Sequence, residues 1–166
     1  LLKKGSYKDI GGLSYTSSLV MLFRTFESDD DSEYLEPSKN VTKFELATFL
    51  VYYSQNKKLY RFDIINDFVQ KAYKAGIIDD YDIDEPLTKE MMFDMIVRFY
   101  EVYTSNAIVA DNTIINRPNI SERYLSSIKK AYQKGWILDY STFNPKSYAN
   151  REYVLATLYK VLTEVR

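Results

Sequence analysis

The chain has 166 residues, no cysteine and no histidine, and its 22 Lys and Arg nearly balance its 23 Asp and Glu. This length predicts a single domain, residues 1–166, that buries enough surface to fold without disulfides or a structural metal. The missing residue types exclude Ser-His triads, cysteine nucleophiles and Cys/His metal sites, and the net charge of -1 argues against the basic face of a nucleic-acid-binding protein.

Apolar residues recur at steps of three and four in six stretches of the chain, a pattern typical of amphipathic helices. The stretches are 19–26, 46–53, 65–73, 92–103, 124–132 and 155–162. Taken in pairs they predict an all-α chain of three helix-loop-helix repeats, each expected to fold as a hairpin. Repeat one covers about 7–55, repeat two about 59–104 and repeat three about 120–166. The Asn- and Thr-rich connection 105–118 is interpreted as a surface insertion.

Two of the repeats share a segment at a spacing of 59 residues. Residues 71–81 and 130–140 have Lys, Ala, Tyr, Gly, an apolar pair, Asp and Tyr in common, and Pro86 and Pro145 keep the same spacing. Gly76 and Gly135 stand where the first helix of each pair should end, a role that suits glycine in the left-handed conformation. The first repeat has diverged more, because Glu27 occupies the place of this glycine.

The second helix of each repeat is expected to begin after a capping residue. Thr42 with Glu45 three residues later forms a capping box, and Thr88 and Asn150 are ordinary N-caps. These four residues are explained by the backbone donors at the helix starts, and they need no ligand.

A cation follows each of these caps, at Lys43, Lys89 and Arg151. The first helical position is where the helix dipole disfavours a positive charge, so the placement asks for a cause. One interpretation is that the three side chains bind an anion beside the free N–H groups of the helix. The other is that they are solvated surface charges.

The order of these motifs resembles the S-layer homology family over nearly the whole chain. The resemblance rests on Tyr7-Lys8-Asp9-Ile10 at the start, on Gly76-Ile77-Ile78 and Gly135-Trp136-Ile137 at the turns, and on Val41-Thr42-Lys43-Phe44-Glu45 at a helix start. It implies a pseudo-threefold bundle that binds a secondary cell wall polymer, or a related peptidoglycan-linked glycan, in grooves between repeats. The expected function is therefore non-catalytic anchoring at the bacterial cell wall or S-layer, outside the cell, with no cofactor and possible self-association.

The resemblance also implies the glycan-binding residues Lys43, Lys89 and Arg151, with Asp9 and Trp136 as further contacts. Two of these are open to a second interpretation: Asp9 as a turn or cap acceptor, and Trp136 as a core residue. The family has arginine at the cationic position, and lysine in two of the three places lacks the bidentate grip on a carboxylate.

Other functions stay open as alternatives. The chain could be an assembly module that has lost glycan binding, or a wall hydrolase using a pair of carboxylates. Asp80, Asp82 and Asp84 alternate as at the start of an EF-hand, but Glu85 and Met91 replace its glycine and glutamate, so we expect solvated acidic loops without metal. No stretch is apolar enough for a membrane span, and the first residues do not form a signal peptide, so we expect a piece of a longer protein.

Overall fold

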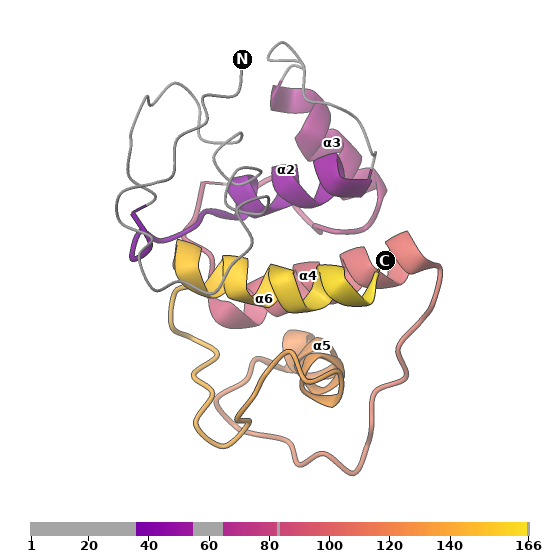
Figure 1. Ribbon diagram of the computed structural model, residues 1–166, viewed down its shortest axis with the longest axis vertical. Helices are drawn as coiled ribbons and strands as arrows, with labels where there is room; N and C mark the ends of the chain where they lie inside the picture. Colours follow the sequence, from indigo (N-terminus) through magenta and orange to yellow (C-terminus); the bar gives the residue numbers. More distant parts are fainter. Residues whose placement is uncertain (1–35, 55–64, 83, 166) are drawn as a thin grey trace.

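The computed structural model describes residues 36–54, 65–82 and 84–165, and in these ranges it contains five α-helices and no strand. The helices are α2 (Lys43–Ser54), α3 (Ile65–Lys74), α4 (Lys89–Thr104), α5 (Glu122–Gln133) and α6 (Arg151–Glu164) (Figure 1). The prediction of an all-α chain is confirmed for these residues. The helix expected over 19–26 lies outside the described residues.

The predicted caps set the starts of α2, α4 and α6. Thr42 and Glu45 form the capping box, since Thr42 Oγ1 accepts from the Glu45 N–H at 3.2 Å and Glu45 Oε2 accepts from the Thr42 N–H at 2.9 Å. Thr88 Oγ1 accepts from the Met91 N–H, and Asn150 Oδ1 accepts from the N–H three residues further on. Each cation of the sequence pattern is therefore the first residue of its helix.

Glycine ends α3 and α5 in the same way. Gly76 and Gly135 both have φ of 72°. The Gly135 N–H donates to Tyr132 O and the Trp136 N–H donates to Ala131 O, both at 2.9 Å, and the equivalent pair of bonds closes α3. This is the Schellman arrangement, in which a left-handed residue lets the chain turn back on the last carbonyls of the helix.

The helices do not pair as the predicted hairpins. The closely packed pairs are α2 with α3 and α4 with α5, while α4 also contacts α2 and α6. The second helix of one predicted repeat thus packs on the first helix of the next, because the loops 75–88 and 134–150 carry the chain away from the helix that it has just left. In Figure 1, α2 and α3 lie at the top, α4 and α6 cross the middle and α5 lies at the bottom.

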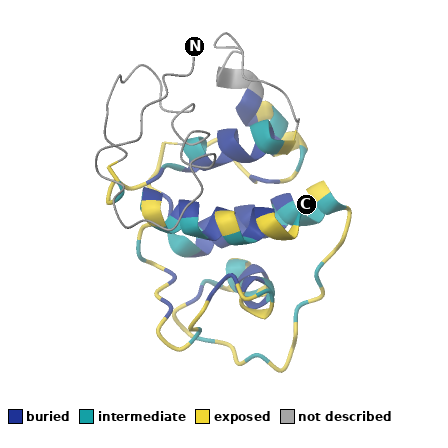
Figure 2. Cartoon of the chain, in the orientation of Figure 1, coloured by how far each residue is buried: buried dark blue, intermediate teal, exposed yellow. Residues whose placement is uncertain are grey.

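The core lies around α2, α4 and α6 (Figure 2). Six of the sixteen residues of α4 are buried hydrophobic side chains in nearly continuous order, because neighbouring helices cover α4 on several sides. They are Met92, Phe93, Met95, Ile96, Val97 and Phe99. In contrast, α5 buries only Ser127, Ile128, Lys129 and Ala131, and the rest of its surface is more exposed.

The three capped helix starts meet at one point in the core. The Leu87 N–H donates to Val41 O at 2.9 Å, the Ala149 N–H to Leu87 O at 2.8 Å, and the Val41 N–H to Ala149 O at 3.0 Å. These bonds close a ring of three residues, all of them fully buried. The ring is a cyclic arrangement of three segments that lie far apart in the sequence.

A second set of bonds places each helix start against the loop of another segment. The Lys43 N–H donates to Glu85 O at 3.3 Å, the Lys89 N–H to Ser147 O at 2.9 Å, and the Arg151 N–H to Lys39 O at 2.9 Å. The first N–H groups of a helix have no partner within it, and here the neighbouring loops satisfy them. As a result, α2 begins beside the loop that precedes α4, α4 beside the loop that precedes α6, and α6 beside the loop that precedes α2.

The expected equivalence of Pro86 and Pro145 is wrong. Gly76 and Gly135 are 59 residues apart, but Lys89 and Arg151 are 62 apart, so the loop before α6 is three residues longer than the loop before α4. The backbone bridges agree, since Pro86 pairs with Thr42 while the corresponding partner of Thr88 is Tyr148, three residues after Pro145. The sequence spacing matched the turns and missed this insertion.

Candidate functional site

The three predicted cations occupy similar places at the helix starts, but their surroundings differ. Lys43 is only 6% exposed. Its Nζ lies 2.5 Å from Asp80 Oδ1 and 3.9 Å from Glu85 Oε1, both on the loop before α4. The hydrogen bond from Lys43 holds the pKa of Asp80 below its usual value. Lys43 is therefore a buried cation whose charge is matched inside the chain.

Arg151 is buried in the same manner, with 2% of its surface exposed. Its Nη1 lies 3.3 Å from Oε2 of Glu36, a half-exposed residue just before α2. The carboxylate again comes from the loop next to the helix start. Arg151 thus also has an internal counter-charge.

Lys89 is different. Its Nζ lies 4.2 Å from the centre of the Tyr153 ring, and among the described residues no carboxylate comes within ion-pair distance of this nitrogen. Partial burial lowers the pKa of Lys89. A lysine that has lost part of its hydration and gained only a ring face is poorly compensated, because burial disfavours the charged form.

A pocket of about 300 Å³ opens beside Lys89. It is lined by Lys89, Tyr148, Asn150, Glu152, Tyr153 and Ala156. We call it the Lys89 pocket. Its volume lies at the lower end of the range of about 300–1,000 Å³ found for small-molecule sites. Burial raises the pKa of Tyr153 to about 12, so its hydroxyl keeps its proton and remains a hydrogen-bond donor.

The cavity beside Lys43 is far smaller, at about 20 Å³. Its lining includes Lys43, Asp79, Met91 and Tyr124, and we call it the Lys43 pocket. A cavity of this size holds about one water molecule. Of the two pockets, only the Lys89 pocket has room for part of a sugar.

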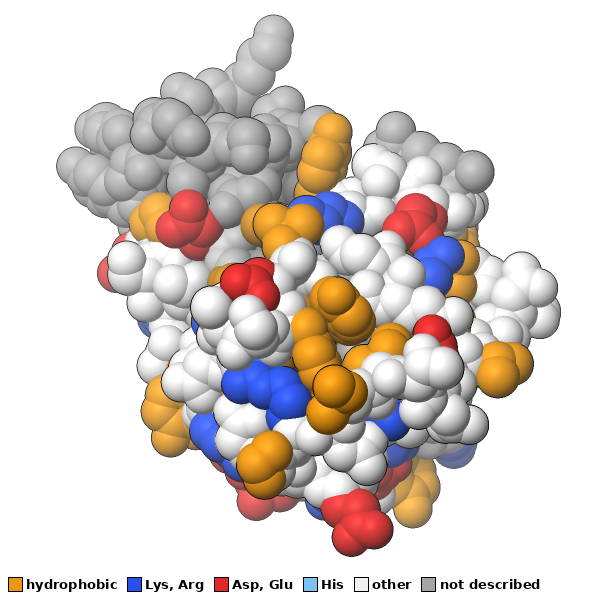
Figure 3. Space-filling model, turned by 90° about the horizontal axis from the view of Figure 1, so that it is seen from below, with side chains coloured by type: hydrophobic (Ala, Val, Ile, Leu, Met, Phe, Trp, Pro, Cys, Tyr) orange, Lys and Arg blue, Asp and Glu red, His pale blue; other side chains and the backbone are white. Residues whose placement is uncertain are grey.

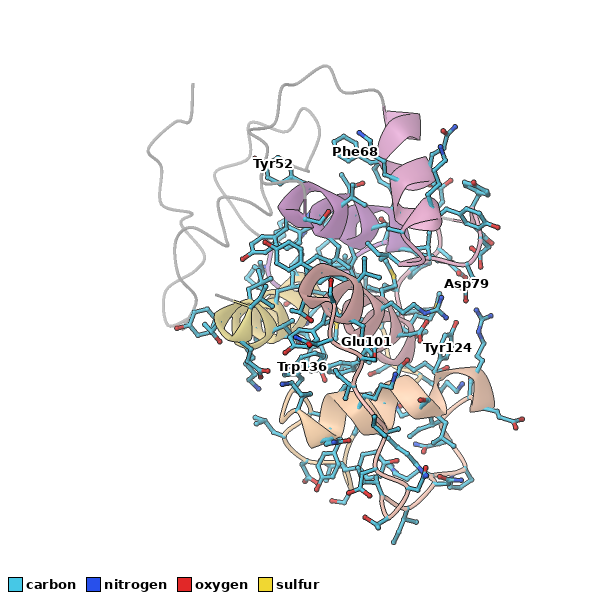
Figure 4. All side chains as sticks on the ribbon, turned by 90° about the vertical axis from the view of Figure 1, so that its right-hand side faces the viewer. Tyr52, Phe68, Asp79, Glu101, Tyr124 and Trp136 are labelled. Atoms are coloured by element: carbon cyan, nitrogen blue, oxygen red, sulfur yellow. The ribbon has the colours of Figure 1, made fainter. Side chains whose placement is uncertain are left out.

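An ionic network that the sequence reading missed lies next to the Lys43 pocket. Asp79 Oδ2 lies 3.0 Å from Nη2 of Arg98 and 3.0 Å from Nη2 of Arg123, which joins the turn after α3 to α4 and α5. Arg98 also pairs with Asp94, whose Oδ1 accepts from Ser127 Oγ at 2.6 Å. Figure 4 shows Asp79 and Tyr124 facing each other on one side of the molecule. The i,i+4 spacing of Asp94 and Arg98 was the available sequence signal.

Part of the tyrosine surplus forms two stacked pairs. Tyr73 and Tyr81 have ring centres 4.7 Å apart, and Tyr132 and Tyr140 have ring centres 4.9 Å apart. Each pair joins the last turn of a helix to the chain just after its glycine turn. The Tyr140 hydroxyl also donates to Ile115 O at 3.0 Å, which fixes the 105–118 insertion. These rings brace the turns, and the exposed surface that they retain is a secondary feature.

Two residues expected to contact a glycan do not join this site. Trp136 is 3% exposed, its Nε1 donates to Glu164 Oε1 at 3.0 Å, and its ring meets the edge of Tyr100. Packing accounts for Trp136, and its faces are not open to a sugar ring. Asp9 lies outside the described residues.

The remaining charges give no second site. Acidic, basic and hydrophobic side chains are interspersed on the face shown in Figure 3. Within the described ranges, no group of three potential metal ligands comes together. In the same part of the chain, every helix is too short or too polar to cross a membrane.

Comparison with known proteins adds no relative. No protein-family model matches this sequence, and no curated protein is similar enough to it to suggest a shared family.

Proposed function

We propose that the chain is a non-catalytic anchoring module that binds an anionic glycan, such as a secondary cell wall polymer, at the outer surface of a bacterium. The resemblance of its motifs to S-layer homology repeats suggests this role. The ring of hydrogen bonds among Val41, Leu87 and Ala149 supports a pseudo-threefold bundle of three repeats, in which each helix start lies at a boundary between two repeats.

The observation that carries the proposal is the state of Lys89. It is a partly buried cation beside a 300 Å³ pocket, and among the described residues it has a tyrosine ring rather than a carboxylate as its close partner. A cation–π contact contributes about 0.5–1 kcal/mol, less than a charge-assisted hydrogen bond at about 1.5–3 kcal/mol. A carboxylate carried by a sugar would supply the stronger interaction, and it would sit close to the positive end of the α4 dipole.

The tyrosines of the Lys89 pocket suit a sugar. Tyr148 is 54% exposed, so its ring offers a face for stacking, and the protonated Tyr153 hydroxyl is available to hydrogen-bond. Lysine binds a carboxylate as a point charge, without the geometry of the arginine fork. We therefore expect moderate affinity at this pocket, raised in the cell by repeated sugars along the polymer.

The test is sedimentation with purified wall sacculi, before and after chemical removal of the secondary polymer. We expect polymer-dependent pelleting that falls by about tenfold in affinity for Lys89→Ala, as the loss of one charge-assisted bond predicts. Lys74→Ala is the control, because Lys74 is an exposed lysine of α3 in no ion pair among the described residues. Equal pelleting of Lys89→Ala and wild type would overturn the proposal, and release of sugar would indicate a hydrolase.

A second candidate is an assembly module without a glycan site. It is favoured by the exposed apolar residues Val109, Ile115 and Leu138, each at least 78% exposed. In that case sacculi stripped of polymer would pellet the protein as well as intact ones. Sedimentation velocity would then show self-association that Leu138→Asp weakens.

A further inference from the structure

Asp80 and Asp139 hold the same place in two loops. They are 59 residues apart, each four positions after a glycine that ends a helix. Asp80 Oδ1 accepts from Lys43 Nζ at 2.5 Å and from the Asp82 N–H at 3.1 Å. Its own loop therefore holds this carboxylate against the first residue of α2.

Asp139 turns to its own loop instead. Its Oδ1 accepts from the N–H of Ser141 at 2.9 Å, from Ser141 Oγ at 2.6 Å and from the Thr142 N–H at 3.4 Å. Among the described residues it forms no ion pair. The cation beside this loop is Lys89, which is the helix start that lacks a carboxylate partner in the described part of the chain.

Loop length explains the contrast. The loop that carries Asp139 has three more residues before its helix than the loop that carries Asp80. In the shorter loop the carboxylate reaches the neighbouring cation and fills the space around it, which leaves a cavity of about 20 Å³. Beside the longer loop the space stays open, at about 300 Å³.

We propose that Asp80 is a built-in ligand that closes the Lys43 pocket, so that of these two pockets only the Lys89 pocket accepts an external anion. The proposal rests on the proposed function in one respect, that the cations at the helix starts face the ligand. It adds which pocket is used and which residue selects it. A tethered carboxylate acts at a high effective concentration, so a sugar carboxylate in solution competes poorly for Lys43.

Inorganic sulfate is a suitable probe, because it tests access to each cation without a glycan. In the wild type we expect sulfate to shift the backbone amide resonances of Lys89 and Glu90 and to leave those of Lys43 and Phe44 unmoved. Asp80→Asn should make the Lys43 and Phe44 amides respond as well. This variant keeps an oxygen for the Asp82 N–H, so the loop retains its local bond.

Asp139→Asn is the matched control, and it should reproduce the wild-type pattern. If Asp80→Asn fails to fold, as its amide spectrum will show, three residues inserted after Asp82 give the shorter loop the length of the longer one and should free Lys43. Sulfate shifts at Lys43 in the wild type, silence at Lys43 in the folded variants, or silence at Lys89 would each overturn the inference. The expected sulfate pattern without any binding to sacculi would instead reject the glycan and leave the selection by Asp80 standing.

Discussion

At Gly76 and Gly135 the backbone requires a residue that tolerates positive φ. A β-carbon added at either position would meet no atom within 4 Å, so space is not the constraint. The constraint is the left-handed conformation itself, with φ of 72°, which side chains of L-residues disfavour. The two positions therefore allow the cost of the conformation to be measured apart from packing.

We expect Gly135→Ala to lower the free energy of unfolding by about 1–2 kcal/mol, the cost of a left-handed alanine. Gly135→Asn should lose less, because asparagine visits this region more readily. Urea denaturation followed by circular dichroism measures both. An alanine variant as stable as the wild type would contradict the assigned backbone conformation.

Between elements, Asp79 fastens the turn after α3 to α4 and α5 through Arg98 and Arg123. The hydrogen bond from Arg98 is the main reason that the pKa of Asp79 is lowered in the folded chain. A carboxyl group with a lowered pKa binds its proton less readily when folded than when unfolded. Its contribution to stability is complete above the unfolded pKa of about 3.9, and it is lost as the pH falls through the lower, folded value.

The corresponding prediction compares the wild type with Asp79→Asn across pH. The variant should have the lower melting temperature from neutral pH down to about pH 5, and the difference should shrink below about pH 4 as Asp79 takes up its proton. Calorimetry at several pH values checks this. Asp84→Asn is a control, since Asp84 is exposed and forms no ion pair among the described residues. A difference that stays constant to the lowest pH would show that the lost stability is not electrostatic.

The sequence predicted these elements better than their neighbours. Caps at Thr42, Thr88 and Asn150 are local, so a few adjacent residues identified them. Helical periodicity tells which face of a helix is buried and not what covers it, so the pairing of α2 with α3 and of α4 with α5 was missed.

For the same reason, the candidate site could be predicted only in part. Lys43, Lys89 and Arg151 were correctly placed at the starts of helices. They were expected to be alike, but Lys43 faces Asp80, Arg151 faces Glu36 and Lys89 faces an aromatic ring. These partners come from loops distant in sequence, and three extra residues in one loop are enough to change them.

For the molecule as a whole, the ring of Val41, Leu87 and Ala149 makes the segments interdependent. Each residue of the ring donates one backbone hydrogen bond and accepts another, so the loss of one segment would leave a buried donor and a buried acceptor unpaired. Unpaired buried polar groups cost about 1–3 kcal/mol each. The packing of α4 on α2, α5 and α6 adds to this dependence.

We therefore expect the chain to unfold in one cooperative transition rather than repeat by repeat. Leu87→Ala, at a fully buried position in the ring, should lower the free energy of unfolding by about 2–5 kcal/mol through the lost burial and the cavity left behind. The fluorescence of Trp136, on the far side of α5, and the circular dichroism of the helices should shift to the same new urea midpoint. Leu138→Ala is the control, because Leu138 is 81% exposed and its removal should change neither. If Leu87→Ala moves the circular dichroism midpoint and leaves the Trp136 midpoint in place, the segments fold independently, and the ring is only a contact between separate units.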